Sequence, residues 1–320
     1  MRGRGAARKH ARWITLFAAV ATTGFVHARM DESPRIAREE LRIPTPERAR
    51  IFALGFEPVI ADYYWVQLLH LVGGSRTDVT AYAKEIGDGV TLVTQLDPWV
   101  DHPYRFGAMW LTRDLEDVRR ANGLLRQAIS YHPTDWRNRF YLGYNLFYYL
   151  QDNAAAADVL EPAISMEGAP TYLGPFVARL RADGGSLETS ALFLETLIRE
   201  APDEYARAEY LKAYDEIQTE RWARQLDGAR VLFWRRHGRD LKEVAELWQG
   251  QKRLLRAAPP PHPHFEGFGW VLDPDTNEIT STFYKARYRL HIHGLDEGMR
   301  ARWRADLEAE RSAQNEGSGG

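Results

Sequence analysis

The chain has 320 residues, of which 44% are apolar and 12% aromatic, enough to build a sizeable core, so extensive disorder is excluded. With 42 basic and 44 acidic side chains, the formal net charge is −2, which argues against a dedicated nucleic-acid-binding protein. The chain contains no cysteine. Disulfides, thiolate zinc sites, iron–sulfur clusters, cysteine nucleophiles and lipid anchors on cysteine are therefore excluded.

The N-terminus is typical of a targeting segment. Residues 1–28 begin with five basic side chains and continue in an apolar run from Trp13 to Val26. A basic block ahead of such a run is a positive-inside signal, and about 14 apolar residues suit a cleaved signal or a short single-pass anchor. We predict either a single-pass protein of the bacterial inner membrane, with its soluble part in the periplasm, or a cleaved periplasmic protein. Residues 29–45 are a charged linker.

Helix-start and helix-stop signals recur after the linker. Thr45 followed by Pro46 is a helix N-terminus, and apolar residues between 79 and 96 recur at spacings of three and four, the period of one helical face. Later helix-ending prolines stand at intervals of 35, 37 and 32 residues, namely Pro98, Pro133, Pro170 and Pro202. These signals predict a series of short helices from residue 46 to residue 202.

The small residues within this series have a regular placement. Ala121, Leu125 and Ala128 precede Pro133 at the spacing of a second repeat helix, and Leu142 and Gly143 open the next unit. With these residues the chain resembles bacterial tetratricopeptide-repeat proteins, whose repeat is about 34 residues long. The resemblance covers residues 46–202. It implies a mainly α fold, a tetratricopeptide-like α-solenoid, and its first helices would line a concave groove.

The last third of the chain changes in character. Residues 203–256 have a helical period and are predicted to form capping helices. Residues 257–294 contain two short β-forming runs around an Asp/Pro/Asn turn, which predicts a β-hairpin element, and residues 295–320 are predicted to be a helix with a disordered tail. The stretch up to the hairpin is weakly similar to the soluble end of type II secretion pseudopilins.

Candidate chemistry is sparse. Asp273 and Asp275 begin like a calcium loop, but the glycine and the bidentate acid that should follow are missing, so we interpret this stretch as a turn. The histidine pairs 262/264 and 291/293 could hold a metal only if the two pairs met. The sequence has no Gly-rich phosphate loop and no Gly-x-Ser-x-Gly elbow. We therefore predict a protein that is not an enzyme and has no cofactor or metal.

The groove implied by the repeats is the predicted functional surface. Counting from Pro133, the groove positions of the repeat family fall on Arg137, Phe140, Tyr144, Phe147 and Tyr148, and neighbouring units add Phe106, Trp110, Arg113 and Arg181. Rigid rings and arginines are typical of peptide-binding surfaces, which predicts an exported scaffold that binds a partner protein. In one alternative, several of these rings are part of the core. In another, the chain is an accessory subunit of a secretion or pilus machine that makes its contacts through the hairpin.

Overall fold

The computed structural model describes Thr22 and residues 41–74, 82–184, 187–290 and 294–317. The chain divides into two units, Met1–Arg42 and Ile43–Gly320. Within the described residues of the second unit the fold is mainly helical, with one small antiparallel sheet of two strands. The coarse prediction of a mainly α protein with a small β-hairpin is thus confirmed.

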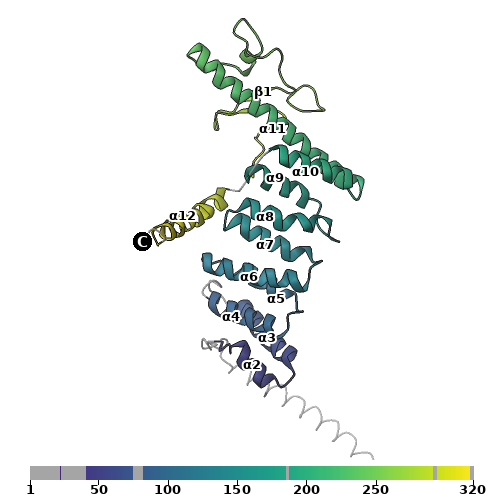
Figure 1. Cartoon of the computed structure of the whole chain (residues 1–320), viewed down its shortest axis with the longest axis vertical. Helices are drawn as coiled ribbons and strands as arrows, with labels where there is room; N and C mark the ends of the chain where they lie inside the picture. Colours follow the sequence, from purple (N-terminus) through teal and green to yellow (C-terminus); the bar gives the residue numbers. More distant parts are fainter. Residues whose placement is uncertain (1–21, 23–40, 75–81, 185–186, 291–293, 318–320) are drawn as a thin grey trace, which may run out of the picture. The chain divides into compact units, whose positions relative to one another are not determined.

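The helices follow one another along the chain and lie side by side in the same order (Figure 1). Their bounds are α2 (Pro46–Ala53), α3 (Glu57–Gly74), α4 (Ala83–Leu96), α5 (His102–Trp110), α6 (Leu115–Tyr131), α7 (Trp136–Tyr148), α8 (Asn153–Leu160), the 3-10 turn η2 (Glu161–Ser165), α9 (Leu173–Gly184), α10 (Leu187–Glu200), α11 (Glu204–His237), the 3-10 turn η3 (Val244–Leu247) and α12 (Gly294–Gly317). The capping helices expected over 203–256 are one 34-residue helix, α11, and the turn η3.

Aspartates set the start of several of these helices. Asp114, Asp135, Asp152 and Asp203 are N-cap residues whose side chains accept a hydrogen bond from a backbone N–H in the first turn of α6, α7, α8 and α11. Such a cap satisfies one of the backbone donors that a helix leaves open at its N-terminus. The loops before α6, α7, α8 and α11 thus each end on the aspartate that caps the next helix.

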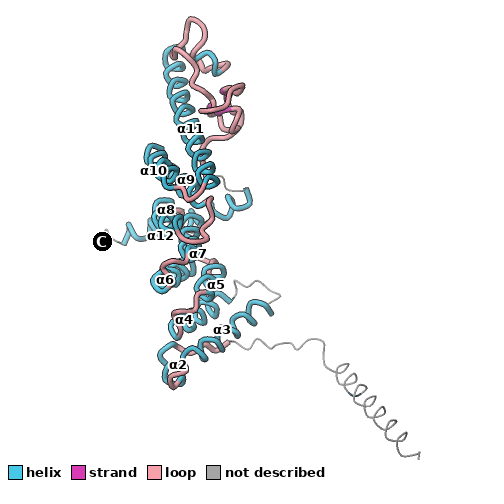
Figure 2. Tube along the Cα trace, turned by 90° about the vertical axis from the view of Figure 1, so that its right-hand side faces the viewer, coloured by secondary structure: helices cyan, strands magenta, loops and turns pink. Residues whose placement is uncertain are grey.

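Neighbouring helices pack in chain order. Each helix from α2 to α10 contacts the next one, while α4 also contacts α6 and α5 also contacts α7 (Figures 1 and 2). A buried cluster joins α7, α8 and α9, and includes Leu142, Leu160 and Leu173. A Cβ atom built on Gly143 would lie 2.5 Å from Cγ of Leu160, so α7 and α8 approach closely at this point. Gly143, which was expected to open a repeat unit, is thus a point of close contact between two helices.

The small sheet packs on the long helix α11. Strand β1 (Trp270–Leu272) pairs antiparallel with β2 (Ile279–Ser281), with Trp270 opposite Ser281. Trp270 and Ile279 are buried in a cluster with Phe233 of α11, and Nε1 of Trp270 donates to the carbonyl oxygen of Pro259 at 2.8 Å. The inner side of the hairpin is therefore occupied within the fold.

The predicted membrane location needs correction. Among the described residues, no helix combines the length and the apolar character needed to cross a membrane. This finding contradicts the predicted single-pass location in the inner membrane. The segment on which the prediction rested, residues 1–28, lies outside the described residues except for Thr22.

Candidate partner-binding surface

Helix α7 is held in place by a buried arginine of α5. Nη1 of Arg105 donates to Oδ2 of Asp135 at 2.7 Å, and Nη2 donates to Oδ2 of Asp101 at 2.6 Å. The other oxygen of Asp135, Oδ1, accepts from the backbone N–H of Arg137 at 3.0 Å. One carboxylate thus caps α7 and joins it to α5, so the outward side chains of the two helices form one continuous face.

Apolar, aromatic and basic side chains lie together on that face. Tyr144 is 37% exposed and Met109 is also exposed, the Arg137 side chain is 55% exposed, and Oη of Tyr141 lies 3.9 Å from the sulfur of Met109. Half-buried Trp110 and Phe140 lie on the same two helices. The α5–α7 face is defined by Met109, Trp110, Arg137, Phe140, Tyr141 and Tyr144.

Three rings predicted to face the partner are buried. Phe106 packs edge-on against Trp65 of α3, with their ring centres 5.0 Å apart. Phe147 packs edge-on against Phe176 of α9 at 5.5 Å, and Tyr148 is only 7% exposed. The exposure predicted for these rings is therefore not found, because each ring is covered within the fold. They belong to the packing between helices: the Phe106 ring contacts α3, and the Phe147 ring contacts α9.

The two remaining arginines of the predicted groove differ in environment. Arg113 is exposed just after α5 and pairs with Asp114 and Asp117, with N···O distances of 3.1 and 3.3 Å. The Arg181 side chain of α9 is largely buried, pairs with Glu161, and lies over the Phe193 ring at 5.7 Å. Arg181 therefore connects α9 to the residues before and after it, and its role in partner binding stays a prediction.

A run of aromatic rings leads from the α5–α7 face to the C-terminal helix. The rings of Tyr144 and Tyr148 stack at 5.2 Å with an interplanar angle of 9°. Tyr148 meets Tyr149 edge-on at 5.0 Å, and Tyr149 meets Trp303 of α12 edge-on at 5.1 Å. The first ring of this run, Tyr144, is exposed, and the last, Trp303, belongs to α12. Local sequence patterns could not indicate this contact between α12 and the end of α7.

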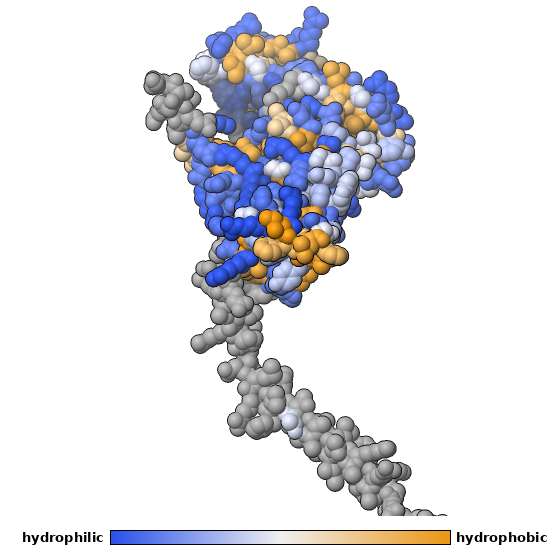
Figure 3. Space-filling model, turned by 60° about the horizontal axis from the view of Figure 1, so that its bottom comes forward, coloured by the Kyte–Doolittle hydropathy of each residue, from blue (hydrophilic) through white to orange (hydrophobic). Residues whose placement is uncertain are grey.

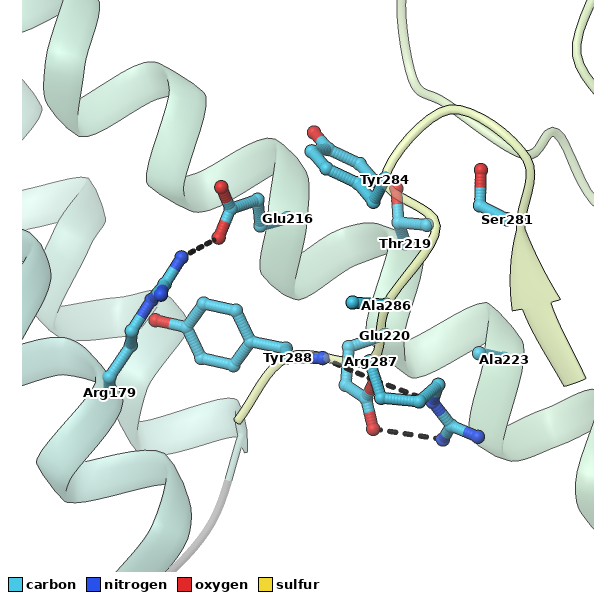
Figure 4. A pocket seen from close by; sticks show the side chains of 10 residues that line it. All are labelled: Arg179, Glu216, Thr219, Glu220, Ala223, Ser281, Tyr284, Ala286, Arg287 and Tyr288. Carbon is cyan, nitrogen blue, oxygen red and sulfur yellow. Dashed lines mark hydrogen bonds and ion pairs between the residues drawn. The ribbon is translucent and has the colours of Figure 1, made fainter. Parts of the chain in front are cut away.

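A small cavity lies between α9, α11 and the segment after β2 (Figure 4). Its volume is about 150 Å³, and Arg179, Glu216, Glu220, Arg287 and Tyr288 are among the residues that line it. Arg179 pairs with Glu216, and Arg287 pairs with Glu220 through two N···O contacts of 2.8 and 2.9 Å. Each arginine is already bound to a carboxylate, and burial raises the pKa of Tyr288. The charges that line the cavity are therefore paired with one another, and the Arg287–Glu220 pair holds the segment after β2 on α11.

The first histidine pair lies against α11. Nε2 of His264 is 3.2 Å from Oδ1 of the buried Asp215. Nδ1 of His262 accepts from the backbone N–H of His264 at 3.0 Å, and burial lowers the pKa of His262. Within the described ranges, no group of three or more histidine or carboxylate side chains is placed to hold a metal. The second pair, at 291 and 293, lies outside the described residues.

Another exposed surface was not expected from the sequence. Large apolar side chains gather on α2, α3 and the turn between them (Figure 3); they are Ile51, Phe52, Leu54, Phe56, Val59, Tyr63, Val66 and Leu69. Exposed apolar patches of this kind mark interaction surfaces more often than scattered single residues do. The signal was present in the spacing of Phe52, Phe56, Val59 and Tyr63, which repeats every three or four residues.

Comparison with known proteins adds no relative. No family model matches the chain, and no curated protein or solved structure is similar to it. The resemblance to tetratricopeptide-repeat proteins and the weaker one to pseudopilins therefore rest on the residues quoted for them.

Proposed function

We propose that the chain is a non-enzymatic scaffold that binds a partner polypeptide on the α5–α7 face. In this proposal the helices form a tetratricopeptide-like α-solenoid. The contacts between alternate helices, α4 with α6 and α5 with α7, support that arrangement because stacked helix pairs bring like helices side by side. The close packing of Gly143 on Leu160 is a further argument for it.

The observation that carries the proposal is the composition of the face. Helices α5 and α7 carry the exposed side chains of Tyr144, Met109 and Arg137 and the half-buried rings of Trp110 and Phe140, and Oη of Tyr141 lies 3.9 Å from the sulfur of Met109. Aromatic residues, methionine and arginine are enriched at protein interfaces, and a few buried anchors supply most of the binding free energy. A partner segment with an apolar anchor would cover the Tyr144 ring and the thioether of Met109.

The charges indicate a carboxylate on the partner. Asp135 is bound by the buried Arg105 at 2.7 Å, while the exposed Arg137 contacts the same carboxylate at 3.4 Å. An exposed pair of this geometry contributes little free energy. Arg137 can therefore turn toward a partner's carboxylate without leaving Asp135 unpaired.

Replacing Tyr144 by alanine tests the proposal. We expect partner binding to weaken by about 1–2 kcal/mol, roughly 5- to 30-fold in Kd, because an interface anchor is truncated. The melting temperature should change little, since Tyr144 is 37% exposed. Retention of the partner by immobilised full-length chain, together with a thermal melt, measures both quantities.

Tyr205→Ala is the matched control, because Tyr205 is an exposed tyrosine on α11, away from the α5–α7 face. It should leave both quantities unchanged. If Tyr144→Ala lowers the melting temperature and leaves partner binding as it was, the ring belongs to the core and the proposal is wrong.

A further inference from the structure

Helix α12 packs on α6 and the end of α7 through the buried side chain of Trp303. Trp303 is 3% exposed and lies in a cluster with Leu115 and Val118 of α6. Tyr149 and Leu307 pack against the same cluster. An indole buried this way on a helix that follows α6 by more than 150 residues marks a preformed apolar site on the surface of α6 and the end of α7.

Polar contacts fix the register of α12 on this site. Nη2 of Arg300 donates to the carbonyl oxygen of Phe147 at 3.2 Å, and its guanidinium lies 4.7 Å from the centre of the Phe147 ring. Gln151 donates to the carbonyl oxygen of Arg300 at 2.9 Å. Glu310 pairs with Arg119 of α6. Positions 300, 303, 307 and 310 share one helical face. The site therefore fits a helix that carries side chains like these at the same spacing.

The site is continuous with the α5–α7 face. The stacked rings run from exposed Tyr144 through Tyr148 and Tyr149 to Trp303. Helix α12 covers one end of this run and leaves Tyr144 and Met109 exposed. A longer or differently placed helix could cover both ends.

We propose that this site, the α12 seat, is where the partner binds and that α12 is its internal stand-in. The α12 seat is defined by Leu115, Val118, Phe147, Tyr149 and Gln151. The partner would present an amphipathic helix with an arginine, an aromatic residue and a leucine at the spacing of Arg300, Trp303 and Leu307, and would displace α12. This inference rests on the proposed function, whose binding surface it extends.

The contacts of α12 are suited to exchange. The Arg119–Glu310 pair is half exposed on the arginine side, so salt screens it and it contributes little. The α12 residues between the seated positions, such as Ala305 and Asp306, are exposed. A tethered helix needs only modest intrinsic affinity, because a short tether gives an effective concentration of about 1 mM. A partner that also covers Tyr144 makes contacts that α12 does not.

Binding of the α12 peptide to the full chain tests the inference. A labelled peptide of residues 294–317 is titrated by fluorescence anisotropy into wild-type chain and into Arg300→Ala/Trp303→Ala chain. The variant should bind the peptide at least about 10-fold more tightly, because its own α12 no longer competes at about 1 mM effective concentration. Trp234→Ala, which removes an exposed tryptophan of α11, should behave like wild type. A peptide carrying Trp303→Ala should bind the double variant at least about 10-fold more weakly.

Equal peptide binding by wild type and double variant would overturn the inference, as would a wild-type dimer that depends on Trp303, which would assign the seat to a second copy. Hydrogen exchange of the wild-type chain covers the case in which the double variant does not fold. The amides of α12 should exchange at least about 10-fold faster than those of α6 and α7, and equal protection would mark α12 as a fixed part of the fold. If the peptide fails to bind but Tyr144→Ala still weakens partner capture, the seat is wrong and the proposed function stands.

Discussion

Replacing Arg287 by methionine should lower the free energy of unfolding by about 3–5 kcal/mol. The Arg287 and Glu220 side chains are only 7% and 5% exposed and form two hydrogen bonds of 2.8 and 2.9 Å. Removing the arginine leaves the Glu220 carboxylate buried, with the more exposed Arg224 and the backbone N–H of Tyr288 as its remaining donors. Equilibrium urea unfolding measures the loss, and a change below about 1 kcal/mol would contradict the buried pair.

The same pair predicts an acid dependence. Burial pushes the pKa of Glu220 up, but hydrogen bonds from Arg287 and Arg224 outweigh it and hold the pKa below the ordinary 4.5. A carboxyl whose folded pKa is lowered contributes stability that is complete above the unfolded pKa and is lost as the pH falls through the folded pKa. The stability difference between wild type and Glu220→Gln should therefore be constant near neutral pH and shrink below about pH 4.5.

Replacing Gly143 by leucine should cost about 2–3 kcal/mol through overpacking. A Cβ at this position would lie 2.5 Å from Cγ and 2.8 Å from Cδ2 of Leu160, so α7 and α8 must move apart to admit the larger side chain. The melting temperature and the urea midpoint should both fall. Unchanged values would mean that the two helices do not meet at this glycine.

Gly123 of α6 is the matched control for this substitution. No atom lies within 4 Å of a Cβ built on it, and a helical glycine costs about 0.5–1 kcal/mol relative to alanine. Gly123→Leu should therefore leave stability unchanged or raise it slightly, so that only the Gly143 variant is destabilised.

Local patterns predicted the helical part of the fold well. The small residues Ala121, Ala128 and Gly143 mark places where neighbouring helices touch, and all three are buried. The Asp/Pro/Asn turn predicted the hairpin because turn geometry depends on a few adjacent residues. Length was harder to predict, since the single helix α11 replaces the several capping helices expected. The repeat family itself stays a prediction.

The exposure of the residues on the candidate surface was predicted correctly only in part. Arg137 and Tyr144 lie exposed as expected, whereas Phe147 and Tyr148 on the same helix are buried. Phe147 packs against Phe176 of α9 and lies under Arg300 of α12, while Tyr148 contacts Tyr149, whose ring meets Trp303 of α12. A helical period indicates which residues share a face. It does not indicate which distant segment covers that face.

Photo-crosslinking from defined positions tests the central claim most directly. A photoreactive phenylalanine analogue is placed in the full chain at Tyr144, at Tyr205 of α11 or at Phe268 beside the hairpin, all exposed positions. The proposal predicts one partner adduct from position 144, lost when Arg137 is changed to glutamate, and none from position 205. An adduct that forms only from position 268 would contradict a partner site on the α5–α7 face and would place the contact at the hairpin.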